Sequence, residues 1–256
     1  MKPILTIILL TTFWVTGCDK GPPKKTYLVA TDATLIPMSF MSVGNNIIGF
    51  EPDLIYAVAE EAGINIEIAN VEWAGLFGGL ITNKFDIGIS SITVLEERKE
   101  RMAFSIPYLK SGLALVVREG QKDINSIEDA RVKNLVIGAQ VGTTAYFFLE
   151  KDEAIHKKGY QMYGHAIADL INGKIDAVLG ESTGTLFYKN KQKQLFEKIK
   201  MVGEIITDEH YAIVLRKEDT QLLEQINSGL QKVLKNGTAT RLHKKWDLGH
   251  AAQIPE

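Results

Sequence analysis

The chain has 256 residues, of which 45% are hydrophobic and 23% are charged, and its formal net charge is −2. This composition is typical of a globular protein and excludes the disordered and fibrous classes. The balanced charge also argues against nucleic acid as a partner, because phosphate binding requires a concentrated basic surface.

Residues 1–17 have the layout of a secretory signal peptide, with a lysine followed by an apolar stretch from Ile4 to Val15. This stretch is too short to span a bilayer, although a buried core helix is an alternative interpretation. The following "VTGC" resembles a bacterial lipobox, in which the cysteine is lipidated and becomes the first residue. Cys18 is the only cysteine, so no intramolecular disulfide can form. We expect residues 18–26 to be a polar tether, and the protein to be anchored to a membrane without spanning it.

From residue 27 onward, short apolar runs alternate with helical patterns. The first unit has expected strands at 27–31, 64–69 and 86–90, with helices at 51–63 and 73–83 between them. This β-α-β-α-β order predicts a mainly parallel sheet covered by helices.

The pattern then restarts in a second unit. Strands are expected at 134–139 and 176–180, and helices at 141–151, 165–173 and 184–191. Two strands of similar character, 111–117 and 210–216, flank this unit, and 220–246 contains two amphipathic helices. We therefore predict an α/β protein of two lobes joined by two crossovers, an arrangement that opens and closes as a hinge.

Ligands of open α/β sheets bind beyond the carboxyl ends of the strands. The cleft is therefore expected to be lined by residues directly after the strands, which are 32–35, 70–73, 90–93, 140–144 and 180–182.

The sequence "SSITVLEERK" supplies a candidate carboxylate site in the first unit. Ser90, Ser91 and Thr93 offer hydroxyl groups after a strand, and Arg98 can reach back over the start of the next helix. The alternative is structural: Thr93 and Glu96 form a capping box, and the charged residues that follow are a solvated helix face.

The second unit has comparable groups at its strand ends. Thr143 and Thr144 follow Gly142 at a helix start, where a simple N-cap is the alternative interpretation. Glu181 ends a strand and could accept hydrogen bonds from an ammonium group, or be an ordinary surface glutamate. Asp32 and Trp73 complete the set, and a cation stacked on the tryptophan would gain roughly 0.5–2 kcal/mol.

Several stretches resemble the bacterial extracellular solute-binding proteins of family 3, the polar amino-acid group. They include "LVATDAT", "IIGFEPDLIYAVAEEAG", "FDIGISSITVLEERKERMAFSIPYLKSGLALVV", "VIGAQVGTT", "INGKIDAVLGES" and "NGTATRLHKKW", and together they extend from about Tyr27 to Gly249. The resemblance implies the two-lobed type II periplasmic binding protein fold with two hinge strands, an amino-acid ligand, and delivery to an ABC importer whose permease lies in the inner membrane.

The resemblance also implies a role for each candidate residue. The grip on the ligand's carboxylate falls on Arg98, Thr93 and Ser91, joined by Thr143 or Thr144. The partner of its ammonium group is Glu181, where such family members usually have aspartate. The determinants of side-chain specificity are Asp32, Leu35, Trp73, Ser90 and Gln140. Leu35 departs from the family because many relatives with cationic or polar ligands have an aromatic residue there.

These features predict a monomeric binding lipoprotein, not an enzyme, in the periplasm or at the cell surface. Lobe 1 is expected to comprise 27–111 and 212–249, and lobe 2 to comprise 112–211. A polar or cationic ligand is expected, with arginine or lysine favoured because of Asp32 and Trp73.

Two other functions remain open at this point. Some family members resemble cyclohexadienyl dehydratases, which eliminate water from prephenate or arogenate and need a general acid such as Glu181. A lipoprotein that senses its ligand through another receptor is the second alternative. No metal or cofactor is expected, because the five histidines are dispersed and no glycine-rich nucleotide motif is present.

Overall fold

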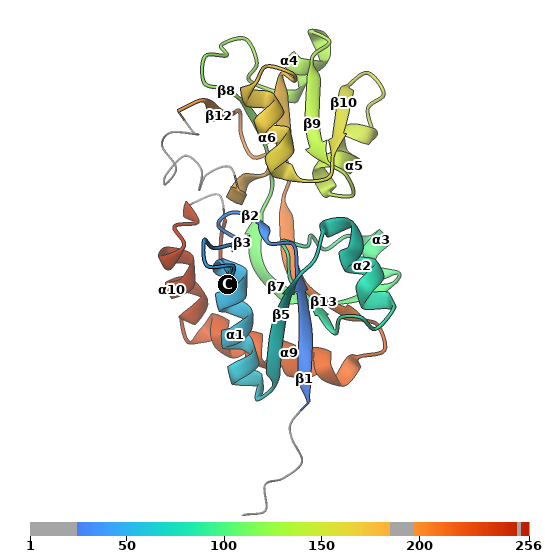
Figure 1. The fold of residues 1–256 in the computed structure, drawn as a ribbon, viewed down its shortest axis with the longest axis vertical. Coiled ribbons are helices and arrows are strands. Elements are labelled where there is room, and N and C mark those ends of the chain that lie inside the picture. The colour runs from blue at the N-terminus through green and yellow to red at the C-terminus, as the bar shows by residue number, and fades with distance from the viewer. Residues whose placement is uncertain (1–24, 185–196, 250–251, 256) are drawn as a thin grey trace, which may run out of the picture.

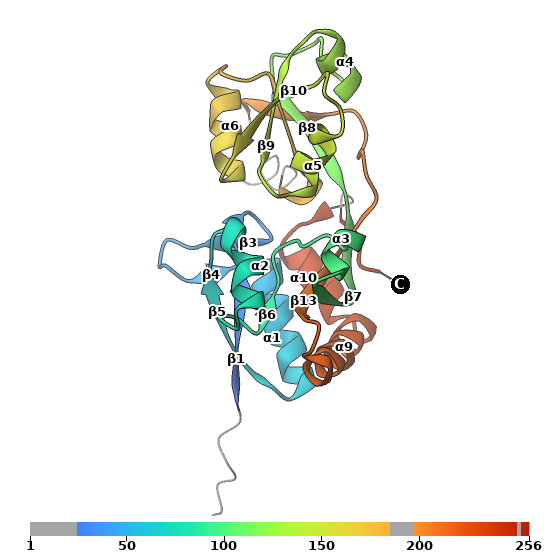
Figure 2. The same cartoon turned by 90° about the vertical axis from the view of Figure 1, so that its right-hand side faces the viewer.

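The computed structural model describes residues 25–184, 197–249 and 252–255. Residues 1–17, Cys18 and nearly all of the helix expected at 184–191 lie outside these ranges. The described residues form two α/β lobes, one above the other in Figures 1 and 2, each built around its own five-stranded sheet.

The sheet of lobe 1 combines parallel and antiparallel strands. Its order is β5 (Asn65–Asn70), β1 (Thr26–Thr31), β6 (Ile87–Gly88), β13 (Glu209–Arg216) and β7 (Met102–Ser111). Strands β5, β1 and β6 are parallel, whereas β13 is antiparallel to both β6 and β7. The expected α/β class is confirmed, and the sheet is mixed because a strand arriving from the other lobe enters it in the opposite direction.

Lobe 2 repeats this plan. Its order is β10 (His156–Tyr160), β9 (Val136–Gln140), β11 (Ala177–Glu181), β8 (Leu113–Arg118) and β12 (Ile199–Val202). Strands β10, β9 and β11 are parallel, and β8 is antiparallel to both of its neighbours. The fourth strand of each sheet is thus the one that enters from the other lobe, which explains the similar sequences of 111–117 and 210–216.

Two crossovers connect the lobes and lie side by side. The first is at Gly112, between β7 and β8, and the second comprises residues 203–208, between β12 and β13. The Leu113 N–H donates to Thr207 Oγ1 at 2.9 Å, and the Ile206 N–H donates to the Leu113 carbonyl at 2.8 Å. A β-carbon on Gly112 would lie 2.0 Å from the Thr207 carbonyl oxygen, so only glycine permits this approach.

Helices cover both faces of each sheet, as Figure 1 shows. Adjacent residues of β1 illustrate this: Val29 belongs to the core under α1 and α9, and Ala30 to the core under α2. Both are fully buried, which accounts for the continuous apolar run in the sequence. The helices that lie wholly within the described ranges are α1 (Phe50–Ala62), α2 (Trp73–Ile81), α3 (Glu96–Lys99), α4 (Ile127–Val132), α5 (Thr144–Glu150), α6 (Tyr163–Ile171), α9 (Thr220–Lys235) and α10 (Thr238–Lys245).

Most expected helices and parallel strands are present within one to three residues of their expected bounds. The sequence analysis missed α4, the edge strands β7, β10 and β12, and a small sheet of β2 (Thr34–Leu35), β3 (Ser39–Met41) and β4 (Ile47–Ile48). The helix expected after Thr93 is present as α3, which begins at Glu96. None of the helices within the described ranges combines the length and the apolar character needed to cross a membrane.

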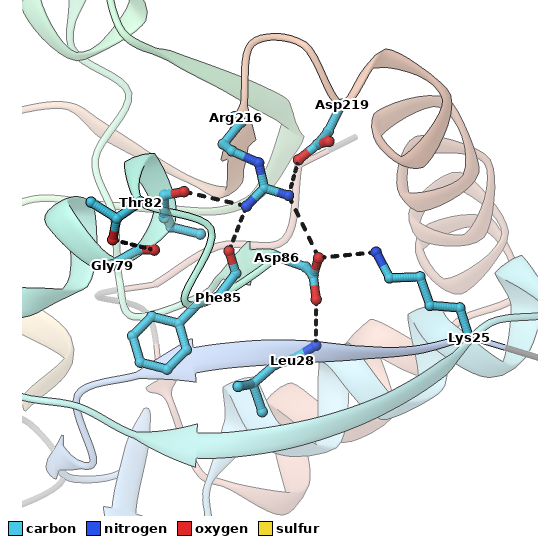
Figure 3. A network of polar contacts seen from close by, with 9 residues as sticks. Lys25, Leu28, Gly79, Thr82, Phe85, Asp86, Arg216 and Asp219 are labelled. Atoms are coloured by element: carbon cyan, nitrogen blue, oxygen red, sulfur yellow. Dashed lines mark hydrogen bonds and ion pairs between the residues drawn. The ribbon is translucent and has the colours of Figure 1, made fainter.

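An arginine, buried in lobe 1 and half-buried in lobe 2, fixes the far end of each crossover strand. Figure 3 shows the Arg216 guanidinium, at the end of β13, between Asp86, Asp219 and the Phe85 carbonyl. It donates to Phe85 O at 2.6 Å and lies 3.5 Å from Asp86 Oδ1, while Asp86 Oδ2 accepts from the Leu28 N–H at 2.9 Å.

Arg118, at the end of β8, makes the equivalent contacts in lobe 2. It donates to Ile175 O at 2.6 Å and lies 3.7 Å from Asp176 Oδ1, while Asp176 Oδ2 accepts from the Val136 N–H at 2.9 Å. Each lobe therefore has its own copy of this polar network, as it has of the sheet topology.

Candidate functional site

The ten predicted binding residues all line two cavities between the lobes. A small cavity of about 30 Å³ is lined by seven of them: Asp32, Trp73, Ser90, Ser91, Gln140, Thr143 and Glu181. A larger cavity of about 850 Å³, on the crossover side, is lined by the other three: Thr93, Arg98 and Thr144. The small cavity has room for about one water molecule, so an amino acid can enter it only if the lobes move apart.

Arg98 stands at the boundary between the two cavities and contacts both lobes. Its Nη1 donates to the Thr93 carbonyl at 3.0 Å, and its Nη2 donates across the lobes to the Gly142 carbonyl at 3.2 Å. The guanidinium carbon lies 5.5 Å from the Trp73 ring and 5.1 Å from the Phe77 ring. Arg98 is therefore a positioned, half-buried cation, and not part of a solvated helix face.

Burial perturbs Arg98 electrostatically as well. It lowers the pKa of the guanidinium to about 10, against the opposing influence of Glu209 and Glu181. Arginine nevertheless stays charged at neutral pH, so this site retains one fixed positive charge.

Trp73 of lobe 1 lies close to the backbone of Gly142 in lobe 2. Gly142 has a φ of +79°, and a β-carbon there would lie 3.2 Å from the Trp73 Nε1. The indole also packs edge-on against Phe77, with ring centroids 5.3 Å apart. A side chain at this position would require Trp73 to shift by a few tenths of an ångström and would strain the backbone, so glycine suits the close approach of the two lobes.

Ser91 is held by a buried glutamate that the sequence analysis did not single out. Its N–H and Oγ donate to Glu51 Oε1 at 2.5 and 3.1 Å, and the Tyr108 hydroxyl donates to the same oxygen. Ser91 has a φ of 49°, an uncommon conformation for a residue with a side chain. Its neighbour Ser90 accepts from the Asp32 N–H at 3.1 Å, so both serines help to shape the strand end.

Thr93 does not cap α3. The N-cap residue of that helix is Leu95, which makes no side-chain capping bond, so the capping-box alternative for Thr93 and Glu96 is wrong. Thr93 is instead paired with Tyr211 in an isolated bridge, and its Oγ1 donates to Glu209 Oε2 at 2.7 Å.

Glu209 is the main site residue that the sequence analysis missed. Only 5% of it is exposed, and its carboxylate accepts from Thr93 of lobe 1, from Thr144 of lobe 2 at 3.2 Å and from Thr207 of the crossover at 3.1 Å. Glu209 is the first residue of β13, whereas the cleft was predicted from residues that directly follow strands. Because β13 is antiparallel to β6, its beginning lies at the edge where β6 ends.

The predicted residues Gln140, Thr143 and Thr144 of lobe 2 form hydrogen bonds around the end of β9 and the start of α5. Thr143 is the N-cap of α5: its Oγ1 accepts from the Tyr146 N–H at 3.4 Å and donates to the Gln140 carbonyl at 2.8 Å. Gln140 Nε2 donates to the Gln161 carbonyl at 2.9 Å and lies 3.5 Å from Asp32 Oδ2 in the other lobe. The N-cap interpretation of Thr143 is thus confirmed, while Thr144 points to Glu209.

Glu181 and Asp32 are buried acids on opposite sides of the small cavity, 9% and 7% exposed. Burial, reinforced by the negative charge of Glu209, raises the pKa of Glu181 to about 7. Burial also raises the pKa of Asp32, although hydrogen bonds from Thr34 and Gln140 oppose the shift. Glu181 is therefore not an ordinary surface glutamate.

Leu35, the predicted departure from the family, links the lobes by apolar contact. It packs against the cores of both lobes, and a β-carbon on Gly184 would lie 2.6 Å from its Cδ1. At this position the chain thus has an aliphatic contact between lobes.

Beside Arg98, the site contains three buried carboxylates, those of Asp32, Glu181 and Glu209. The larger cavity is also lined by Glu97, Asp208 and Lys151. This arrangement suits a ligand that carries at least one ammonium or guanidinium group together with an anionic group for Arg98. Within the described ranges, no group of three or more His, Cys, Asp or Glu side chains is arranged to hold a metal ion.

Comparison with known proteins gives a family and a set of relatives. The model of the bacterial extracellular solute-binding proteins, family 3, matches residues 27–250. The chain is 26% identical over 230 residues to the L-cystine-binding protein TcyJ of Escherichia coli, covering 89% of this chain and 85% of the relative. It is 28% identical over 253 residues to the putative ABC transporter arginine-binding protein 2 of the same organism, covering 96% and 99%.

Solved structures share the two-lobed fold. An ancestral arginine-binding protein bound to arginine superposes with a TM-score of 0.80 at 33% identity, covering 86% of this chain and 97% of that one. The ancestral amino acid-binding protein AncCDT-1, a precursor of cyclohexadienyl dehydratase, gives a TM-score of 0.78 at 30% identity, covering 86% and 94%.

Proposed function

This chain belongs to the bacterial extracellular solute-binding proteins of family 3, and we propose from this that it captures a free amino acid between its lobes and delivers it to an ABC importer. The observation that carries the proposal is the placement of Arg98 and Glu181. Arg98 of lobe 1 lines the larger cavity and Glu181 of lobe 2 lines the smaller one, and both cavities lie between the lobes. A zwitterion bound there would be held by both lobes at once.

Each end of an α-amino acid has suitable partners in the site. The ligand carboxylate would bind Arg98 and the hydroxyls of Ser91, Thr93 and Thr143 or Thr144, with charge-assisted hydrogen bonds. Its ammonium group would bind Glu181, and proximity to the ammonium would return that acid to its charged form. Asp32, Leu35, Trp73, Ser90 and Gln140 would surround the ligand side chain.

A cationic side chain is favoured by the charge balance. Once Arg98 and the ligand carboxylate pair, and Glu181 pairs with the ammonium group, the carboxylate of Asp32 is left in the small cavity, which Trp73 also lines. A guanidinium or ammonium group satisfies both neighbours. The relatives named for arginine support this preference, and the one named for cystine supports the wider class of polar amino acids.

Binding would proceed by closure of two rigid lobes. We assign 27–111 and 209–249 to one lobe and 113–202 to the other, with bending at Gly112 and residues 203–208. The second boundary moves from the expected position after residue 211 to the start of β13, because that strand lies wholly in the sheet of lobe 1. The ligand would stabilise the closed form in proportion to its contacts with both lobes, and the importer would recognise that form. Anchoring through a lipidated Cys18 at the periplasmic or outer surface would keep the monomeric protein near its permease.

Isothermal titration calorimetry of the purified full chain against the twenty amino acids tests this function. We expect micromolar or tighter binding for at least one polar or cationic amino acid, with L-arginine and L-lysine ahead of L-glutamate. A lack of binding to every amino acid at millimolar concentration would rule the proposal out.

An elimination reaction on prephenate or arogenate is the second candidate, and the pKa of Glu181 favours it. A carboxyl group with a pKa of about 7 is partly protonated at neutral pH and can donate a proton to a leaving hydroxyl group. The similarity to a precursor of cyclohexadienyl dehydratase points the same way. Incubation with prephenate distinguishes the candidates, because only the enzyme would release phenylpyruvate.

A further inference from the structure

Glu209 accepts hydrogen bonds from donors that the proposed function assigns to the ligand. Thr93 and Thr144 come from different lobes, yet both donate to the same oxygen, Glu209 Oε2, at 2.7 and 3.2 Å. A threonine hydroxyl has one hydrogen to donate. Neither threonine can therefore serve Glu209 and a ligand carboxylate simultaneously.

The surroundings of Glu209 match those of a bound carboxylate. It is 5% exposed, and its second oxygen accepts from Thr207 at 3.1 Å. Burial lowers the pKa of the neighbouring Arg98 guanidinium, and the negative charge of Glu209 opposes that lowering. Hydroxyl donors and a nearby guanidinium are the groups that recognise a free carboxylate. The protein thus presents its own carboxylate at the position proposed for that of the ligand.

We propose that Glu209 is an internal competitor for the ligand's carboxylate and thereby determines how tightly the site holds an α-amino acid. This inference rests on the proposed function. For the ligand carboxylate to bind Thr93 or Thr144, the bond from that threonine to Glu209 must break. The affinity for an amino acid is then reduced by the strength of the bonds lost, whereas a ligand without a carboxylate leaves them intact.

The location of Glu209 couples this exchange to the crossover. It lies two residues after Thr207, whose Oγ1 both donates to Glu209 and accepts from the Leu113 N–H of the first crossover. Displacement of Glu209 by a ligand would therefore act directly on the segment where the lobes are joined.

The experiment compares an amino acid with its decarboxylated amine, using calorimetry on the full chain. The probe pair is L-arginine and agmatine, or the tightest amino acid of the panel above and its own amine. Three proteins are titrated: wild type, Glu209→Gln, and Asp208→Asn as the control. Asp208 is the adjacent acid and also lines the larger cavity, but its side chain is 63% exposed and pairs with Lys110 rather than with a threonine. The control therefore removes the same charge without affecting either threonine.

We expect Glu209→Gln to bind the amino acid about tenfold tighter, because a neutral amide oxygen is a weaker acceptor than a carboxylate. The amine, which does not use the threonines, should bind equally well or more weakly because a nearby negative charge is lost. Asp208→Asn should change neither affinity by more than about twofold. If Glu209→Gln does not fold, as judged by circular dichroism, Glu209→Asp replaces it, since the shorter side chain withdraws the carboxylate from both threonines.

The possible results separate this inference from the proposed function. If wild type binds no amino acid, both fail. If wild type binds but Glu209→Gln weakens the amino acid and the amine alike, Glu209 is a direct partner of the ligand's positive charge, and only the competitor role is overturned. Equal affinities in all three proteins would also overturn it.

Discussion

Lowering the pH from 8 to 5 is expected to weaken amino-acid binding about 100-fold, because Glu181 takes up a proton over this range. Its pKa is raised to about 7 by burial and by Glu209, whereas an ammonium ligand requires the charged carboxylate. Below that pKa, the affinity should fall about tenfold for each pH unit. At pH 8 only about a tenth of the sites carry the proton, so the affinity is close to its maximum.

The same pKa shift predicts the opposite trend for the stability of the unliganded protein. Between the ordinary value of 4.5 and about 7, Glu181 is protonated in the folded state and ionised in the unfolded chain. The unfolded state binds fewer protons in this window, so the free energy of unfolding falls as the pH rises through it and is level above it. The fall attributable to Glu181 is about 3 kcal/mol, at ~1.4 kcal/mol for each pKa unit.

Glu181→Gln separates this residue from the other buried acids. Burial also raises the pKa of Asp32 and of Glu51, so the wild-type curves contain their contributions as well. Glutamine keeps the shape of the side chain and cannot titrate. Calorimetry at four pH values between 5 and 8, paired with urea unfolding of both proteins, therefore gives the contribution of Glu181 as a difference. A wild-type affinity that is constant from pH 5 to 8, or an equal pH slope in Glu181→Gln, would refute the reasoning.

Three other outcomes are expected. Arg98→Met should weaken amino-acid binding by roughly 2–5 kcal/mol in calorimetry, the cost of leaving a ligand carboxylate buried without its partner, while exposed Arg101→Met should have little effect. Urea unfolding should show a loss of about 3 kcal/mol for Arg216→Met and a smaller loss for Arg118→Met, because their side chains are 8% and 31% exposed; equal losses would contradict this account. Cys18→Ser should move the protein from the membrane fraction to the soluble fraction, and unchanged fractionation would contradict lipid anchoring.

The elements that could be predicted are those whose apolar residues follow a regular pattern in the sequence. Strands β1 and β9 are buried on both faces, so they appear as continuous apolar runs. Helix α1 has its apolar residues at helical spacing and ends at Gly63, which has a φ of 69°. The edge strands lack such signals: β10 reads "HKKGY" and alternates poorly, and β7 contains Pro107, which an edge strand tolerates because one side is unpaired.

The site was predictable where it follows the carboxyl ends of parallel strands. All ten residues chosen on that rule, or from the family resemblance, line the two cavities. Glu209 was not predicted, because it lies at the beginning of an antiparallel strand and the prediction considered only residues directly after strands. The sequence contains no sign of which way a strand will run. Glu51 was not predicted either, because it lies in the first turn of α1, where the helix dipole is already a sufficient reason for an acidic residue.

The paired arginine networks explain how the protein can move between the lobes without loosening within them. Arg216 and Arg118 lie at the ends of β13 and β8 that are distant from the crossovers, and each ties its strand to an aspartate and to a backbone carbonyl of its own lobe (Figure 3 shows the network of Arg216). At the opposite end, Leu113 of β8 contacts Thr207 of the crossover that leads into β13. Each crossover strand is thus fixed at one end and joined to the other lobe at its other end, so we expect bending at Gly112 and at residues 203–208. Substitutions at the arginines should therefore lower the free energy of unfolding of a lobe while leaving ligand affinity unchanged, and substitutions at Glu209 or Thr207 should do the reverse.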